Sequence, residues 1–371
     1  MFFDREIKKL GFGLMRLPQK DGAIDVEQVK EMVDMFMDAG CTYFDTAWAY
    51  QGSEAAIREA LVERYPRDSF QLATKNAAWL MCHSKEEAEA QFETSLRNTG
   101  AEYFDNYLLH NLGTPRTQFF DQYEMWDFVR RKKQEGKIRH YGFSFHSSPE
   151  ELEELLQKHP DVDFVQLQIN YADWENISIQ SRANYEVARK YGKPIIIMEP
   201  LKGGLLADPP ETVKKILKEA DASLPLASWG IRFAASLEGV LLVLSGMSSV
   251  GQMQDNLSYM TDFQSMSGKE IEVVEKARTE LESIPIIPCT GCEYCAKVCP
   301  ENVGISGVFT AANIYYQFGN LPAAKQKAFI LTERRGLKMA SACLQCGTCE
   351  EACPQHIGIR EELAKAAQIL E

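Results

Sequence analysis

Short apolar runs alternate with helical patterns along most of this chain, and this alternation restricts the fold more than any other feature of the sequence. The runs lie at Tyr43–Asp45, Phe70–Lys75, Tyr103–His110, Ile138–Phe145, Phe164–Ile169, Pro194–Met198 and Val240–Ser245. Helical patterns lie near Asp25–Asp38, Glu54–Arg64, Lys85–Arg97, Thr117–Gln134, Pro149–Lys158, Ser178–Tyr191, Leu226–Ser236, Gln252–Met260 and Gly268–Ser283. Because the runs are short and mainly apolar, they predict strands that are buried on both faces, as in parallel sheets.

The number of these repeating units favours a closed barrel. With the segment Phe2–Pro18, which contains LGFGLMRLP, the chain has about eight strand–helix units. Eight units in roughly 250–270 residues predict an α/β fold of the (β/α)8 barrel type. A doubly wound open sheet is the alternative, but no GxGxxG follows the first strand and the units do not divide into two halves.

Composition limits what the chain binds and where it works. Of its 371 residues 45% are hydrophobic, and its net charge is −13 with no basic block. This argues against nucleic acid or an anionic membrane as a partner. No apolar stretch is long enough to cross a bilayer, and the N-terminal MFFDREIKK has charges where a signal peptide needs apolar residues. We therefore expect a cytoplasmic protein, in which the ten cysteines do not form disulfides.

Eight of the ten cysteines follow residue 288, and their spacing predicts two iron–sulfur clusters. The motif C-x2-C-x2-C-x3-C-P occurs twice, at Cys289, Cys292, Cys295, Cys299 and at Cys343, Cys346, Cys349, Cys353. In paired motifs of this spacing the fourth cysteine ligates the other cluster. We therefore predict one [4Fe–4S] site of Cys289, Cys292, Cys295 and Cys353, and a second of Cys343, Cys346, Cys349 and Cys299. Zinc is the alternative, but it normally takes two CxxC pairs or Cys/His mixtures.

The cysteine-rich segment also predicts a second domain. The stiff linker IPIIP places a boundary near residue 284, between a barrel domain at 1–284 and a cluster domain at 285–371. Helical patterns at Phe309–Phe318 and Ala323–Arg335 separate the motifs, so this domain resembles the α-helical ferredoxin type rather than the small hairpin ferredoxins.

Four polar residues lie at or near the ends of three successive predicted strands. These are Asp45, Tyr50, Lys75 and His110. Each has an ordinary explanation alone: a capped turn, a packed ring, a surface lysine or a hydrogen-bonded core histidine. Because catalytic groups of a barrel gather at the carboxyl ends of its strands, together they suggest acid–base chemistry. A lysine beside a tyrosine lowers the pKa of the phenol, and a carboxylate holds the lysine in place.

The segments around these residues resemble the aldo-keto reductase family from residue 1 to about 265. They are LGFGLMRLP, FDTAWAY, LATK, DNYLLH, IRHYGFS, MEPLKGG and LSGMSSVGQMQDN. The resemblance implies that Tyr50 donates a proton, that Lys75 and Asp45 tune it, and that His110 orients the carbonyl. It also implies NAD or NADP at the barrel mouth, bound by Ser144, Gln168, Leu201, Gly203, Gly204, Ser245, Gly246, Ser248, Gln252 and Asn256.

The sequence departs from the family pattern at three cofactor positions. Phe145 replaces an asparagine that bonds the carboxamide, and Met198 replaces an aromatic ring that stacks on the nicotinamide. Gln252 stands where members that prefer NADP often have an arginine. These changes weaken the nicotinamide pocket and the case for NADP over NAD. The group with a C-terminal iron–sulfur domain is the part of the family that the whole chain resembles.

Two functions follow from these features. The first is an NAD(P)H-dependent oxidoreductase that reduces a small-molecule carbonyl and transfers electrons through its clusters. Since nicotinamide moves two electrons and each cluster one, this function needs a bound flavin, a flavoprotein partner or a radical-tolerant substrate, unless the clusters are structural. A ferredoxin is a further possible redox partner. The second is a redox sensor or electron carrier whose barrel is not catalytic.

Overall fold

The computed structural model describes residues 7–371, so the start of the predicted segment Phe2–Pro18 lies outside the described residues. The chain divides into two compact units. One runs up to Gly203 and includes Ser223–Ile271, and the other consists of Gly204–Ala222 and Glu272–Glu371. Residue 284 remains our proposed boundary between the barrel and cluster domains. Among residues 7–371 no helix is long and apolar enough to cross a membrane.

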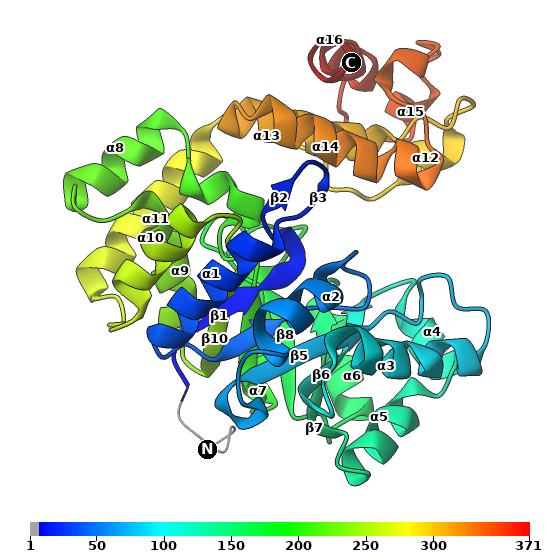
Figure 1. Ribbon diagram of the computed structural model, residues 1–371. Coiled ribbons are helices and arrows are strands. Elements are labelled where there is room, and N and C mark those ends of the chain that lie inside the picture. The colour runs from blue at the N-terminus through cyan, green and yellow to red at the C-terminus, as the bar shows by residue number, and fades with distance from the viewer. Residues whose placement is uncertain (1–6) are drawn as a thin grey trace. The chain divides into compact units, whose positions relative to one another are not determined.

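In the described part of the first unit, eight parallel strands close into a barrel, which confirms the predicted fold (Figure 1). The order around the barrel is β1-β10-β9-β8-β7-β6-β5-β4, and β1 pairs with β4 to close it. The strands are β1 (Leu10–Gly13), β4 (Tyr43–Asp45), β5 (Gln71–Asn76), β6 (Phe104–Leu112), β7 (Ile138–Phe145), β8 (Phe164–Gln168), β9 (Ile195–Met198) and β10 (Val240–Ser245).

The strands are apolar on both faces because each face packs against a separate core. Inside the barrel one buried layer consists of Tyr43, Ala73, Leu108, Phe164, Ile196, Leu242 and Leu244. On the outer face of β4, Phe44 contacts Phe36 of α1 (Val26–Asp38) with ring centroids 5.2 Å apart. Burying one such ring contributes roughly 1.5–3 kcal/mol. The continuous apolar runs of the sequence reflect these two cores.

Helices alternate with the barrel strands, and four of them begin at a side-chain cap. After α1 they are α2 (Ser53–Ile57), α3 (Lys85–Thr99), α4 (Thr117–Gln122), α5 (Met125–Gln134), α6 (Pro149–Lys158), α7 (Ser181–Lys190), α9 (Leu226–Ser236) and α10 (Val250–Met260). Asp25, Ser84, Ser148 and Ser249 each accept a hydrogen bond from a backbone N–H of the first turn. Such caps each contribute about 1 kcal/mol. A small antiparallel hairpin, β2 (Gln19–Lys20) and β3 (Ala23–Ile24), follows β1.

Two helix predictions were wrong in detail. The predicted helix Thr117–Gln134 is two helices, because Glu124 has a left-handed backbone with φ of 53°. The predicted helix near Glu54–Arg64 begins at Ser53 and is α-helical only to Ile57. Gly52 occupies the N-cap, and the Ser53 hydroxyl donates to the carbonyl of Leu14 at 2.9 Å. After Ile57 the chain continues as a π-helical turn, Arg58–Val62.

The second unit is helical. It contains α8 (Glu211–Ala220), which the sequence patterns did not identify, and most of α11 (Gly268–Ser283), which was predicted with these bounds. Its other helices are α12 (Tyr294–Val298), α13 (Ile305–Phe318), α14 (Leu321–Leu331), α15 (Thr348–Glu351) and α16 (Ile359–Leu370). The core of this unit includes Val308, Phe309 and Leu363 together with several of the cysteines. Short 3₁₀ turns lie at Leu14–Arg16, Arg67–Ser69, Lys202–Ala207, Glu333–Arg335 and Ala340–Ala342.

Candidate active site and cluster sites

A buried ion pair lies at the carboxyl ends of β4 and β5. Lys75 and Asp45 are 1% and 3% exposed, and the Lys75 ammonium contacts Asp45 Oδ1. The ammonium also donates to the carbonyl of Thr46 at 2.7 Å, and Asp45 Oδ2 accepts from Gln166 Nε2 at 3.2 Å. Buried charges persist only when they are paired and hydrogen-bonded, and both conditions hold here.

Tyr50 and His110 lie beside this pair. Tyr50 is in the loop that follows β4, and the Lys75 ammonium is 4.9 Å from the centre of its ring. The rings of Tyr50 and His110 meet edge to face with centroids 5.6 Å apart. The indole N–H of Trp79 donates to the His110 carbonyl at 2.8 Å. The structure thus brings together the four residues that the sequence predicted as an acid–base group.

Lys75 is protonated and Tyr50 is neutral at ordinary pH, the first because of its neighbours and the second because of burial. Burial alone would lower the pKa of Lys75, but Asp45 and Tyr50 together raise it above its ordinary value. Burial raises the pKa of Tyr50, and Lys75 offsets only part of this change. Lys75 thus lowers the phenol pKa, as the sequence predicted, but desolvation of the phenolate outweighs the nearby cation and the net pKa is raised.

His110 is neutral at ordinary pH. Burial lowers its pKa well below 6.5, and the positive charge of Lys75 lowers it further. Within the described residues its Nδ1 atom is buried without a hydrogen-bond partner. A neutral imidazole can donate a hydrogen bond without adding a second cation beside Lys75.

The residues predicted to hold the nicotinamide carboxamide lie on β7 and β8. The Ser144 hydroxyl accepts from the Asn111 N–H at 2.7 Å, and Gln168 Nε2 donates to the buried Asp173 carboxylate at 3.3 Å. The sequence argument missed Gln166, which is 1% exposed and pairs in register with Ser144. A glutamine between Val165 and Leu167, in the middle of a predicted buried strand, was the signal that could have identified it.

The predicted diphosphate and adenosine positions follow β9 and β10. Gly203 and Gly204 have φ of 71° and 100°, a conformation that glycine adopts at little cost. The Ser245 hydroxyl donates to Asn256 Oδ1 at 2.7 Å, and both residues are buried. Leu201 lies beside Gly230, and Gly246 lies near the backbone of Gly13.

Gln252 occupies part of the loop predicted to bind the adenosine end. Its Oε1 atom accepts from the Ser248 N–H at 2.7 Å, and its own N–H donates to the Ser249 hydroxyl at 3.3 Å. Ser248 therefore has an internal acceptor at the start of α10. Among the other departures, Phe145 is 2% exposed and packs on Phe143, with centroids 6.2 Å apart.

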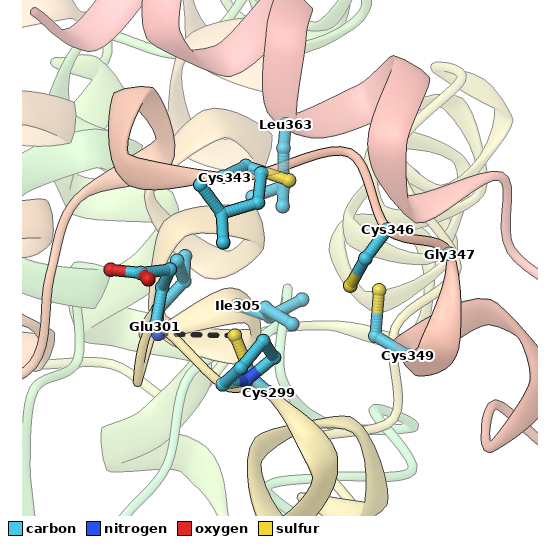
Figure 2. Close-up of a pocket in the computed structure, with 11 residues that line it drawn as sticks. Cys299, Glu301, Ile305, Cys343, Cys346, Gly347, Cys349 and Leu363 are labelled. Atoms are coloured by element: carbon cyan, nitrogen blue, oxygen red, sulfur yellow. Dashed lines mark hydrogen bonds between the residues drawn. The ribbon is translucent and has the colours of Figure 1, made fainter.

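The cysteines surround two hollows in the second unit. Cys289, Cys292, Cys295 and Cys353 line the first hollow with Glu293 and Ser306. Cys299, Cys343, Cys346 and Cys349 line the second hollow with Glu301 and Gly347 (Figure 2). Each hollow therefore has three cysteines of one motif and the fourth of the other, which is the grouping that the sequence predicted. Ile305 lines both hollows.

The donor set of each hollow fits an iron–sulfur cluster. Four thiols face a shared space, and thiolates are the ligands of [4Fe–4S] clusters. Burial raises the pKa of the Cys295 thiol to about 12, and a bound metal would favour the thiolate form. At Cys346 the Thr348 hydroxyl and backbone N–H groups lower the thiol pKa.

The family models match both parts of the chain. Residues 9–278 match the model described as aldo/keto reductase family, and residues 288–357 match a 4Fe-4S dicluster domain. The first match spans most of the chain.

The similarity to curated relatives extends over only part of each protein. A 4-dihydromethyl-trisporate dehydrogenase of Mucor mucedo is 37% identical over 100 residues, which are 27% of this chain and 30% of that protein. A 9,11-endoperoxide prostaglandin H2 reductase of Trypanosoma cruzi is 30% identical over 202 residues, which are 53% of this chain and 62% of that protein. The match thus spans less than two thirds of each of these relatives.

Solved structures share the barrel. The holo form of an aldo-keto reductase from Bacillus halodurans has a TM-score of 0.57 at 24% identity, covering 74% of this chain and 95% of that one. An aldo/keto reductase from Klebsiella pneumoniae, in complex with NADP and acetate, has a TM-score of 0.60 at 22% identity, covering 73% and 91%. At these identities the likeness shows the fold.

Proposed function

Because the chain belongs to the aldo/keto reductase family, an oxidoreductase family, we propose that it reduces a small-molecule carbonyl compound with NAD(P)H. The observation that carries the proposal is the buried Lys75–Asp45 pair beside Tyr50, with His110 against the same ring. A buried ion pair seldom adds net stability, so its presence at the strand ends supports a role in chemistry.

Each residue of this group has a distinct task in the proposed reaction. Tyr50, kept neutral by burial, donates its proton to the carbonyl oxygen. Lys75 then stabilises the phenolate that remains, and Asp45 holds Lys75 charged and in position. The neutral His110 donates a hydrogen bond that fixes the carbonyl before transfer. The nicotinamide, when bound, supplies the hydride.

Removal of the Tyr50 hydroxyl tests this function. We expect Tyr50→Phe to lower kcat/KM on any active carbonyl on the order of 10²–10⁴-fold, because a general acid contributes about that much. The Kd for NADPH, measured by protein fluorescence, should not change. Tyr185→Phe removes a hydroxyl that bonds the Glu238 carbonyl at the surface, so it should keep full activity. An unchanged rate in Tyr50→Phe would sink the enzyme function at this site.

We further propose that two [4Fe–4S] clusters, held by the cysteines of the two hollows, take part in electron transfer. Each cluster carries one electron at a time, whereas a hydride carries two. Exchange between NADPH and the clusters therefore needs a group that accepts two electrons and passes them on one at a time, such as a bound flavin or a flavoprotein partner. A ferredoxin partner would exchange single electrons with the clusters themselves.

Mixing the holoprotein with NADPH under anaerobic conditions tests the need for an intermediary. We expect the cluster absorbance to bleach slowly with NADPH alone and faster after free flavin is added. Fast stoichiometric bleaching by NADPH alone would contradict the proposal. If Tyr50→Phe were fully active while the clusters still cycled, the electron-carrier function would be favoured over the reductase.

A further inference from the structure

The two cysteine motifs carry different side chains at equivalent positions. Between the second and third cysteines the first motif has Glu293 and Tyr294, and the second has Gly347 and Thr348. Glu293 and Gly347 share a left-handed backbone, with φ of 62° and 85°. Since the backbone turns in the same way at both places, the hollows differ mainly in the chemistry of the side chains around them.

A carboxylate without a cation faces the first hollow. Glu293 lines it, and its Oε1 atom accepts a hydrogen bond from the hydroxyl of Ser306, which lines the same hollow. Among residues 7–371 no basic side chain forms an ion pair with Glu293. The hydroxyl fixes the carboxylate but does not cancel its charge, so the first hollow has a fixed negative charge.

Hydrogen-bond donors and compensated charges surround the second hollow. The Thr348 hydroxyl is 3.5 Å from Cys346 Sγ, and Cys343 Sγ accepts from the Gln345 N–H at 3.4 Å. The Val303 N–H donates to Cys299 Sγ at 3.4 Å. The one acidic side chain in its described lining, Glu301, is paired with Lys338.

A negative charge near an iron–sulfur cluster disfavours its reduction, and hydrogen bonds to its sulfur ligands favour reduction. We propose that Glu293 and Thr348 set the two clusters at different potentials, so that the cluster of Cys299, Cys343, Cys346 and Cys349 is reduced first. This inference rests on the proposed cluster ligation and is independent of carbonyl reduction in the barrel.

This difference in potential gives electron transfer between the two clusters a direction. Ile305 lines both hollows, so the two clusters would be neighbours. An electron that reaches the Cys289 cluster therefore has a more favourable acceptor next to it, and one that reaches the second cluster stays there. The second cluster is the expected resting place of a single electron.

The anaerobically prepared holoprotein allows a direct measurement. Iron and sulfide analysis should give about eight of each per chain. A reductive titration followed by electron paramagnetic resonance should then show two separate one-electron steps. This step pattern in the wild type tests the proposal even if a variant assembles its clusters poorly, and a single shared potential would overturn it.

Two isosteric variants assign the steps. Glu293→Gln keeps an acceptor for Ser306 but removes the charge, so the lower potential should rise while the higher one stays. Thr348→Val removes the hydroxyl, so the higher potential should fall while the lower one stays. Glu333→Gln and Thr279→Val change exposed residues that line neither hollow, and both should reproduce the wild-type titration. A shift of the higher potential in Glu293→Gln, or no shift in Thr348→Val, would overturn the assignment.

Discussion

At the scale of single residues, the Lys75–Asp45 pair makes the barrel depend on a balance of two buried charges. Lys75→Met removes one charge and leaves the Asp45 carboxylate buried with Gln166 as its remaining side-chain donor. We expect the free energy of unfolding to fall by about 3–5 kcal/mol, the usual cost of an uncompensated buried charge. Urea unfolding followed by tryptophan fluorescence would measure the loss.

The double variant Lys75→Met/Asp45→Asn separates stability from catalysis. Because neither residue is then charged, most of the lost stability should return. The carbonyl reductase activity should not return, since Tyr50 lacks the cation that stabilises its phenolate. Recovery of activity together with stability would mean that the pair is only structural.

The lowered pKa of His159 should make the free energy of unfolding depend on pH. Its ring stacks on Trp126 with centroids 3.7 Å apart, and burial, followed by Lys158 and Arg130, lowers its pKa from 6.5 to about 4. The unfolded chain binds this proton more tightly, so stability is complete above pH 6.5 and decreases as the pH falls toward 4. His159→Phe keeps the stacking and should remove roughly 2 kcal/mol of this decrease. Urea unfolding at pH 7 and 4.5 measures this. An equal loss of stability between the two pH values in the wild type and in His159→Phe would contradict the prediction.

At the scale of elements, the spacing between β7 and β8 depends on Gly142. A Cβ atom at this position would lie 2.3 Å from the carbonyl oxygen of Phe164, so an alanine must push the two strands apart. We expect Gly142→Ala to destabilise the barrel by about 1–3 kcal/mol through overpacking. Ser144 and Gln166 also pair across these strands, so cofactor binding should weaken as well.

Gly268→Ala is the matched control for this substitution. Nothing lies within 4 Å of a Cβ at Gly268, the first residue of α11. Alanine there should leave the unfolding midpoint unchanged or raise it slightly, because it favours helix. Equal effects of the two substitutions would show that strand spacing at Gly142 is not the cause.

Strands and helices were predictable from the sequence where most residues of the element are buried. The strands Tyr43–Asp45, Ile138–Phe145 and Val240–Ser245 have the predicted bounds, because most of their residues are buried in the barrel. The four polar residues at strand ends were predictable for a related reason, since parallel strands bring their carboxyl ends to one edge.

The predictions failed where local backbone geometry or several competing contacts decide the outcome. The break at Glu124 depends on a single positive φ, which no periodicity reveals. The pKa of Tyr50 depends on burial against charge, and a sequence gives the neighbours without their balance. Gln166 was missed because its partner Asp45 lies 121 positions away in the chain.

At the scale of the whole molecule, the two units differ in what holds them together. The barrel closes through backbone pairing of eight strands and an aromatic and aliphatic core. The core of the second unit includes cysteines, with Cys295, Cys349 and Cys353 buried beside Val308 and Phe309. Since metal binding and folding are coupled in such sites, the second unit should depend on its clusters far more than the barrel does.

Cluster removal with a chelator under mild oxidation, followed by reduction of any disulfides, tests this difference. We expect hydrogen exchange to become fast across α13 and α16, because no cluster then links the four cysteines around each hollow. The strands β5 and β6 should keep their protection. Cys41 provides an internal control for thiol labelling, since it is fully buried and burial raises its pKa to about 11.

In the cluster-free protein the eight motif cysteines should therefore react with an alkylating agent while Cys41 does not. If α13 kept its protection without iron, the second unit would fold without needing its clusters. If β5 and β6 lost protection together with α13, the two units would fold as one cooperative body. Either result would contradict the proposal that the clusters organise only the second unit. Labelling of Cys41 would accompany the second result alone, because that thiol reacts only when the barrel opens.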